Sequence, residues 1–184
     1  MYFGSRDLSA IAICSALWFV LNTWISPIFF QFTRMPFLCD LLGFASLSLV
    51  IWWTRRFGSS SLTGLIVAVL SLIARPTALQ MIGFVAASIL FDILTRAIGY
   101  RNILERSKSG HFILVVFSTL CAGLAGLIIG SFFMGYKTVT PILIWTGLHA
   151  VGGLIGGIIG AIIIKALAER KISSLISEPP ISTK

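Results

Sequence analysis

Charge is what this sequence has least of. Only 11% of its 184 residues are charged and six are acidic, whereas about one quarter of the residues in a soluble domain are charged. Too few polar groups remain to cover a globule in water, which excludes a soluble enzyme. Disorder is excluded as well, because 57% of the residues are hydrophobic and 12% are aromatic, and disordered chains are poor in both. The composition indicates an integral membrane protein.

Patterns for metal binding and catalysis are also scarce. The cysteines Cys14, Cys39 and Cys121 are far apart and form no CxxC pair or Cys/His cluster, so we expect small packing residues and no metal site or disulfide framework. The sequence has no Walker loop, no Gly-x-Ser-x-Gly, no His-Glu-x-x-His and no paired carboxylates within an apolar run. We therefore expect no ATP hydrolysis, no cofactor and no enzymatic activity. The function classes that remain are binding and transport.

Six apolar runs fit membrane helices, which need about 20 mainly apolar residues. The predicted helices span Leu8–Ser26, Phe37–Trp53, Ser60–Ala74, Ala78–Leu94, Phe112–Phe133 and Pro141–Leu167. A five-helix alternative would fuse the third and fourth runs across Arg75-Pro76, but an Arg-Pro step ends a helix. We predict an all-α membrane protein with six transmembrane helices in one bundle (residues 1–171) and a disordered tail (residues 172–184).

The basic residues divide unequally between the two sides of such a bundle. Eleven lie on the side of the two termini: Arg6, Arg55, Arg56, Arg96, Arg101, Arg106, Lys108, Lys165, Arg170, Lys171 and Lys184. Only Arg34, Arg75 and Lys137 lie on the other side. Because Lys and Arg are enriched in cytoplasmic loops, we expect both termini in the cytoplasm and the protein in the cell membrane. Topology thus explains the net charge of +8, and we expect no nucleic-acid partner.

Polar and aromatic residues gather in the outer halves of the predicted helices. They are Trp18, Asn22, Gln80, Phe84, Trp145 and His149. Trp145, His149, Gly152 and Gly156 follow helical spacing and form one stripe, which glycine packing turns towards the bundle interior. Aromatic walls with a few hydrogen-bonding groups are typical of a small-molecule pocket. We predict that Trp145 stacks on a substrate and His149 hydrogen-bonds it; the alternative is a neutral, structural His149 bonded to a neighbouring helix.

The outer loops add further candidates. The apolar segment Pro27–Pro36 either lies in the membrane interface or folds over the bundle as a lid, and Gln31, Arg34 and Arg75 are candidate gating residues. Each basic residue of these loops either binds an anionic ligand or extends to lipid headgroups.

Two acids lie within or beside apolar runs. Asp92 precedes Arg96 by four residues, the spacing of an ion pair along one helix face, and we expect that pair. Asp40 lies at the outer start of the second predicted helix, and its role stays open.

The first predicted helix contains Ala12-x-x-x-Ala16, a pair of small residues that either serves internal packing or lets a partner helix approach closely. Six short helices, the apolar first outer loop, the glycine-rich sixth helix and the stretch Ala74–Arg96 (ARPTALQMIGFVAASILFDILTR) accompany this pair. In this combination the sequence resembles the S components of energy-coupling factor (ECF) transporters.

The resemblance implies a membrane-embedded subunit that binds a vitamin or a similar micronutrient and associates with a transmembrane coupling subunit and two cytoplasmic ATPases. It implies that Ala12 and Ala16 contact the coupling subunit. The family's ligand pocket lies in the outer half, which fits Gln80, Tyr136, Trp145 and His149. The rival hypothesis is a self-contained oligomeric channel or secondary transporter for a small solute, which would carry ionisable groups at the membrane midplane.

Overall fold

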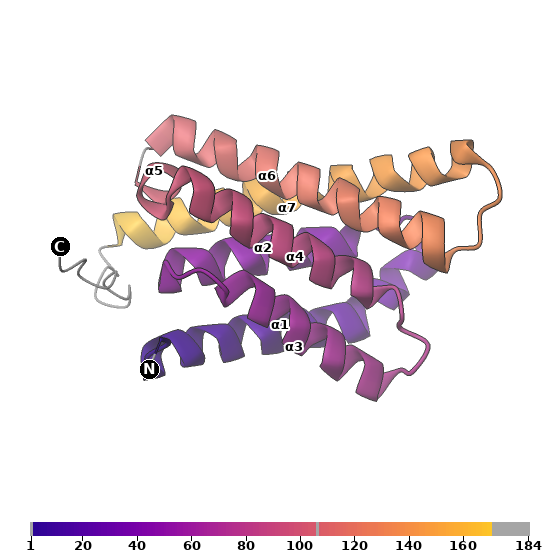
Figure 1. Ribbon diagram of the computed structural model, residues 1–184, viewed down its shortest axis with the longest axis horizontal. Coiled ribbons are helices and arrows are strands. Elements are labelled where there is room, and N and C mark those ends of the chain that lie inside the picture. Colours follow the sequence, from indigo (N-terminus) through magenta and orange to yellow (C-terminus); the bar gives the residue numbers. More distant parts are fainter. Residues whose placement is uncertain (1, 106, 171–184) are drawn as a thin grey trace.

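The computed structural model describes residues 2–105 and 107–170, and this part of the chain is helical throughout, without strands (Figure 1). The helices are α1 (Ser5–Thr33), α2 (Phe37–Thr54), α3 (Ser59–Ala74), α4 (Met81–Ile98), α5 (Tyr100–Leu104), α6 (Ser107–Ile128) and α7 (Val139–Glu169). A π-helical turn, η1 (Ile129–Phe133), continues α6. The predicted tail at residues 172–184 lies outside the described residues.

Five of these helices are long and apolar enough to cross a membrane: α1, α2, α4, α6 with its π turn, and α7. The sixth predicted span, α3, has 16 residues. At 1.5 Å per residue it is about 24 Å long, slightly less than the ~30 Å hydrocarbon core of a bilayer. The helices are therefore those of a membrane protein.

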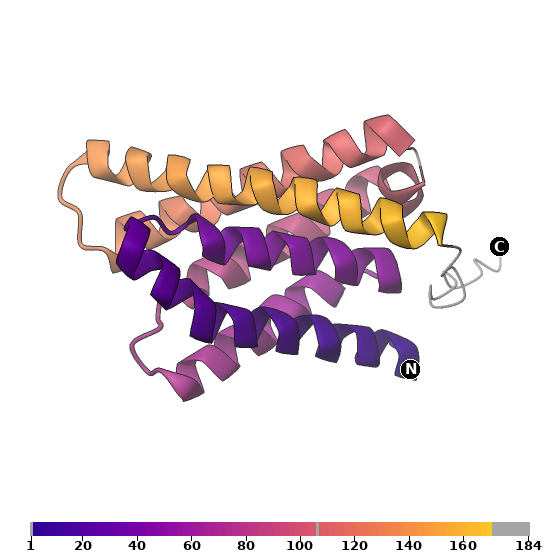
Figure 2. The same ribbon diagram turned by 180° about the vertical axis from the view of Figure 1, so that it is seen from behind.

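The long helices and α3 form one bundle. Around it, α1 contacts α2, α2 contacts α7, α7 contacts α6, α6 contacts α4, α4 contacts α3, and α3 contacts α1. The start of α1, the end of α7 and the short α5 lie together at one end of the bundle, which we call the α5 end (Figures 1 and 2).

Glycine explains how closely α7 approaches its two neighbours. One row of glycines faces α2 (Gly152, Gly156 and Gly160), and a second row faces α6 (Gly153 and Gly157). A Cβ atom at Gly152 would lie 2.5 Å from the Phe37 carbonyl oxygen, and one at Gly153 would lie 2.5 Å from the Ser118 carbonyl oxygen. Small residues allow such backbone contact between membrane helices, so the two glycine rows hold α7 between α2 and α6.

The first predicted loop, Pro27–Pro36, is mostly helix, so the predicted end of the first helix at Ser26 was wrong. The helix α1 continues through Pro27 and ends at Arg34, whose φ of 57° is left-handed and whose N–H donates to the Phe30 carbonyl at 2.8 Å. Proline inside a helix removes one hydrogen bond and bends the helix without having to end it. Figure 2 shows the C-terminal part of α1 bending across the bundle towards the start of α2.

The expected ion pair between Asp92 and Arg96 is absent. Asp92 is fully buried and its Oδ2 accepts hydrogen bonds from the Ser61 backbone N–H at 2.9 Å and from the Ser61 hydroxyl at 2.8 Å, whereas Arg96 is exposed. The first N–H groups of a helix have no partner within the helix and attract negative charge. Asp92 on α4 therefore caps the start of α3, and these N–H groups replace the arginine.

Candidate functional site

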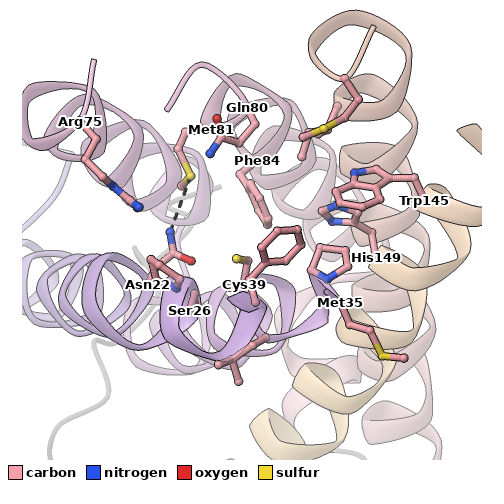
Figure 3. A pocket seen from close by; sticks show the side chains of 16 residues that line it. Asn22, Ser26, Met35, Cys39, Arg75, Gln80, Met81, Phe84, Trp145 and His149 are labelled. Atoms are coloured by element: carbon pink, nitrogen blue, oxygen red, sulfur yellow. Dashed lines mark hydrogen bonds between the residues drawn. The ribbon is translucent and has the colours of Figure 1, made fainter. Parts of the chain in front are cut away.

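A cavity of about 340 Å³ lies at the end of the bundle opposite to α5, and we call this the cavity end (Figure 3). Its lining comes from α1, α2, α4, η1, α7 and the connections between them: Asn22, Ser26, Pro27, Phe30, Met35, Pro36, Leu38, Cys39, Arg75, Gln80, Met81, Phe84, Ile129, Met134, Trp145 and His149. Ligand pockets have volumes of about 300–1,000 Å³. The cavity therefore has room for a small organic molecule.

The structure brings many of the predicted site residues together and leaves others apart. Those in the cavity lining are Asn22, Gln80, Phe84, Trp145, His149 and Arg75. Trp18 and Tyr136 do not line it. Trp18 is buried behind the wall, with its ring edge-on to Phe84 at 5.8 Å between centroids, and the absence of a side chain at Gly43 makes room for it. The Tyr136 ring lies outside the lining, 6.3 Å from the Trp145 ring between centroids.

Two predicted gating residues and the predicted partner residues face outwards. Gln31 and Arg34, near the end of α1, are both exposed and outside the cavity lining. Ala12 and Ala16 are exposed on the outer face of α1. They do not serve packing within this bundle.

One side of the cavity is aromatic. The His149 ring lies 6.0 Å from Phe84 and 5.6 Å from Trp145, and the Phe30 ring lies 6.4 Å from Trp145. These are separations at which aromatic rings attract one another. The indole N–H of Trp145 is buried and has no partner. This wall can take a flat ring and donate one hydrogen bond to it.

The other side is polar. In Figure 3, Arg75 and Asn22 lie across the open space from Trp145 and His149. The Asn22 amide donates a weak hydrogen bond to the Met81 sulfur at 3.8 Å, which leaves its Oδ1 without a partner. Arg75 Nε is also buried, without a hydrogen-bond partner in residues 2–105 and 107–170. Since buried polar atoms are nearly always hydrogen-bonded, these atoms are suited to binding a ligand.

A contact between Asp40 and His149 supports the aromatic wall. Asp40 Oδ2 lies 2.7 Å from His149 Nδ1, and the two side chains are 0% and 3% exposed. Close helix packing makes the contact possible: a Cβ at Gly126 would lie 2.6 Å from His149 Cβ, and one at Gly152 would lie 2.8 Å from Asp40 Cβ. His149 Nε2 has no partner in the described residues. The Nε2 atom of the imidazole can therefore form a hydrogen bond with a ligand.

Our reading of the sequence missed Asp40 as a neighbour of His149. Asp40 and His149 each lie in an apolar run, near the predicted outer side. Ionisable groups that are buried in the membrane usually pair with one another, so the sequence did contain a sign of this contact.

It also missed the sulfur atoms. All three methionines that the structure describes line the cavity, namely Met35, Met81 and Met134, and Cys39 lines it with them. Cys14 and Cys121 are instead fully buried, as expected of packing residues. Methionine adapts its shape and attracts aromatic rings, so these residues suit a flat ligand. The spacing of the methionines in the sequence contains no sign of this.

In residues 2–105 and 107–170, no three His, Cys, Asp or Glu side chains gather as a metal site would require. A scan of protein-family models, a search of curated proteins and a search of solved structures each found no match to the chain.

Proposed function

We propose that this chain is the substrate-binding S component of an ECF-type transporter. It captures a vitamin or a related micronutrient outside the cell and delivers it inwards with an ATPase-driven coupling module. The observation that carries the proposal is the cavity, in which an aromatic wall faces unpartnered polar atoms across about 340 Å³. An apolar cavity with a few polar atoms is typical of a binding protein. The residues that line it include no pair of a nucleophile and a general base.

The distribution of charge supports an outward-facing cavity. Arg34, Arg75 and Lys137 are the basic residues in the connections of the cavity end, and the other eleven of the 14 lie in the segments that we predict on the opposite side. Cytoplasmic segments are the ones enriched in Lys and Arg. In the proposal all six apolar helices span the membrane, with α3 packed between α1 and α4, and both termini are cytoplasmic.

The outer face of α1 supports a partner helix. Ala12 and Ala16 are exposed there, and Ser5 and Ser9 continue the same row of small residues towards the start of the helix. A row of small residues allows a second helix to approach closely within the membrane. Energy must come from this partner and its ATPases, since the chain has no Walker loop.

Capture of the coupling module tests the proposal. The tagged chain, expressed in its native cells, should copurify with a membrane protein and two ATPases, and the double variant Ala12→Trp with Ala16→Trp should lose all three. Leu17→Trp is the matched control, because Leu17 is 47% exposed on the same helix but about 100° or more away from the alanine row. Capture that is unchanged in the double variant would contradict the proposal.

The Asp40–His149 contact favours a second candidate, a proton-coupled secondary transporter. Buried ionisable groups beside a substrate cavity are typical of proton relays. Such a transporter works alone, so proteoliposomes with the pure chain and an imposed pH gradient separate the two candidates. Uptake of the molecule that copurifies with the chain, without ATPases, would support the second candidate and exclude the first.

A further inference from the structure

Arg75 lines the cavity without a carboxylate partner. Every carboxylate of the described residues has another partner. These contacts are Asp7 with Arg56, Glu105 with Arg55 and Arg101, Glu169 with Lys165, Asp92 with Ser61, and Asp40 with His149. Within residues 2–105 and 107–170, no carboxylate is therefore left to pair with Arg75.

The backbone fixes the position of Arg75. Its N–H donates to the Ser71 carbonyl at 2.8 Å at the end of α3, and its own carbonyl accepts from the Ala78 N–H at 2.9 Å. Pro76 follows and restricts the chain further. The side chain is only partly exposed, and its Nε is buried. A guanidinium withdrawn from water in this way is stabilised by a hydrogen-bonded anion.

The groups next to Arg75 are neutral. Asn22, Ser26 and Gln80 line the same cavity and offer amide and hydroxyl groups. Asp40 contributes nothing to the lining, because its carboxylate lies behind His149 and contacts that ring. No carboxylate of the described chain therefore competes inside the cavity for a ligand's negative group.

We infer that the cavity selects an aromatic or heteroaromatic molecule with one anionic group, a carboxylate or a phosphate ester. The anion binds the Arg75 guanidinium, and the ring lies against Trp145 and His149 on the opposite wall. The methionine sulfurs complete the contact with the ring. As a statement about transported substrates this rests on the proposed function, whereas recognition in the cavity does not depend on a coupling module.

Cys39 allows the charge of the cavity to be measured in the intact protein. It lines the cavity, while Cys14 and Cys121 are fully buried. In lipid nanodiscs, the chain is reacted with three methanethiosulfonates: the anionic sulfonatoethyl and the cationic trimethylammonioethyl reagents, which are similar in size, and the smaller neutral methyl reagent. Intact-mass spectrometry gives the rates, each divided by the reagent's rate with a free thiol, and Cys39→Ser confirms the site of reaction.

We expect the anionic reagent to modify Cys39 several-fold faster than the cationic one, and this ratio to fall roughly tenfold in Arg75→Gln. Arg75→Lys should retain the ratio, since it keeps the charge, and so should Arg34→Gln, because Arg34 is exposed outside the lining. A ratio near one in the wild type, no change in Arg75→Gln, or no reaction with the neutral reagent would each overturn the inference.

Matched ligands form the second arm. Indole-3-acetate should protect Cys39 from the neutral reagent at lower concentration than indole-3-acetamide, and Arg75→Gln should abolish the difference. Nanodiscs with and without anionic lipid separate a small-molecule anion from a lipid phosphate: an Arg75-dependent ratio that appears only with one lipid composition would assign Arg75 to lipid and overturn the inference. Acid selectivity with no capture of a coupling module would refute the proposed function and leave the inference standing.

Discussion

The two ends of the bundle differ in how their polar groups are partnered. At the α5 end, acids contact bases: Asp7 lies 2.9 Å from Arg56, and Glu105 lies 2.7 Å from Arg55 and 3.1 Å from Arg101. At the cavity end, the Arg75 Nε, the Asn22 amide oxygen and the Trp145 indole N–H have no hydrogen-bond partner among the described residues and belong to side chains that line one cavity. Ion pairs and caps stabilise the first end. At the second end, the polar atoms that line the cavity are available to bind a ligand.

Unpartnered atoms alone do not make this distinction. The buried Ser60 hydroxyl at the α5 end also has no hydrogen-bond partner among the described residues, but it lies outside the cavity. The difference is convergence, since the atoms at the cavity end line one space from several helices. We therefore expect substitutions of the paired polar residues at the α5 end to change stability, and substitutions of the side chains that line the cavity to change binding.

The largest expected effect comes from the glycines that hold the two halves of the cavity together. Gly152→Leu should destabilise the bundle by more than the ~1–3 kcal/mol of ordinary overpacking, because its Cβ would meet the Phe37 backbone at 2.5 Å. Thermal unfolding in detergent measures the loss. Gly147→Leu on the same helix is the control, since nothing lies within 4 Å of a Cβ there. Equal stability of the two variants would contradict the packing of α7.

Asp92→Ala should give the next largest effect. It removes two hydrogen bonds to a charged, buried group and leaves the Ser61 N–H unpaired, which amounts to about 2–3 kcal/mol of unfolding free energy. Ligand affinity of the folded fraction should stay unchanged. The control is Glu169→Ala, whose ion pair with Lys165 is largely exposed and should contribute nothing measurable. A loss of ligand affinity in Asp92→Ala would contradict the claim that polar residues at the α5 end affect only stability.

At the cavity end, Trp145→Ala and His149→Ala should weaken binding of the molecule that copurifies with the chain. A stacking partner contributes about 0.5–1.5 kcal/mol beyond buried area and a buried hydrogen bond about 1–3 kcal/mol, so each variant should lose roughly three- to hundred-fold in affinity. Calorimetric titration measures the loss. If His149 is purely structural, its variant instead lowers the unfolding temperature and keeps the affinity.

The smallest effect is expected at the two exposed gating candidates. Gln31→Ala and Arg34→Gln should change affinity less than twofold, because neither residue lines the cavity. The same titration with both variants checks this. A large loss in either one would show that the end of α1 closes over bound ligand, and would favour the lid over the interfacial position, the two alternatives that the sequence leaves open.

The sequence sufficed for what hydrophobic periodicity controls. The run Phe37–Trp53 is observed as the helix Phe37–Thr54, and the run Ser60–Ala74 as the helix Ser59–Ala74. In both cases a polar or basic residue follows or precedes the apolar run and sets the boundary. Glycine spacing likewise predicted that one face of α7 turns inwards, because only protein contact makes glycine useful in a membrane helix.

Contacts between side chains of different helices could not be predicted from the sequence. Asp40 and His149 are 109 positions apart in the sequence, and they meet only because glycines bring α2, α6 and α7 close together. Asp92 had a favourable neighbour on its own helix, yet the free N–H groups of α3 were the better partner for a buried carboxylate. Pro27 looked like the end of a helix, and the bent continuation of α1 depends on the bundle that it covers.

Native mass spectrometry of the gently purified chain tests the central claim most directly. The account predicts one small organic molecule bound per chain in the wild type, and equal occupancy in Arg34→Gln and Leu17→Trp, which leave the cavity unchanged. Occupancy should fall sharply in Trp145→Ala and His149→Ala, although both remain folded. A wild type with no bound molecule after growth in rich medium, or equal occupancy in all four variants, would contradict the assignment of the cavity as a binding site.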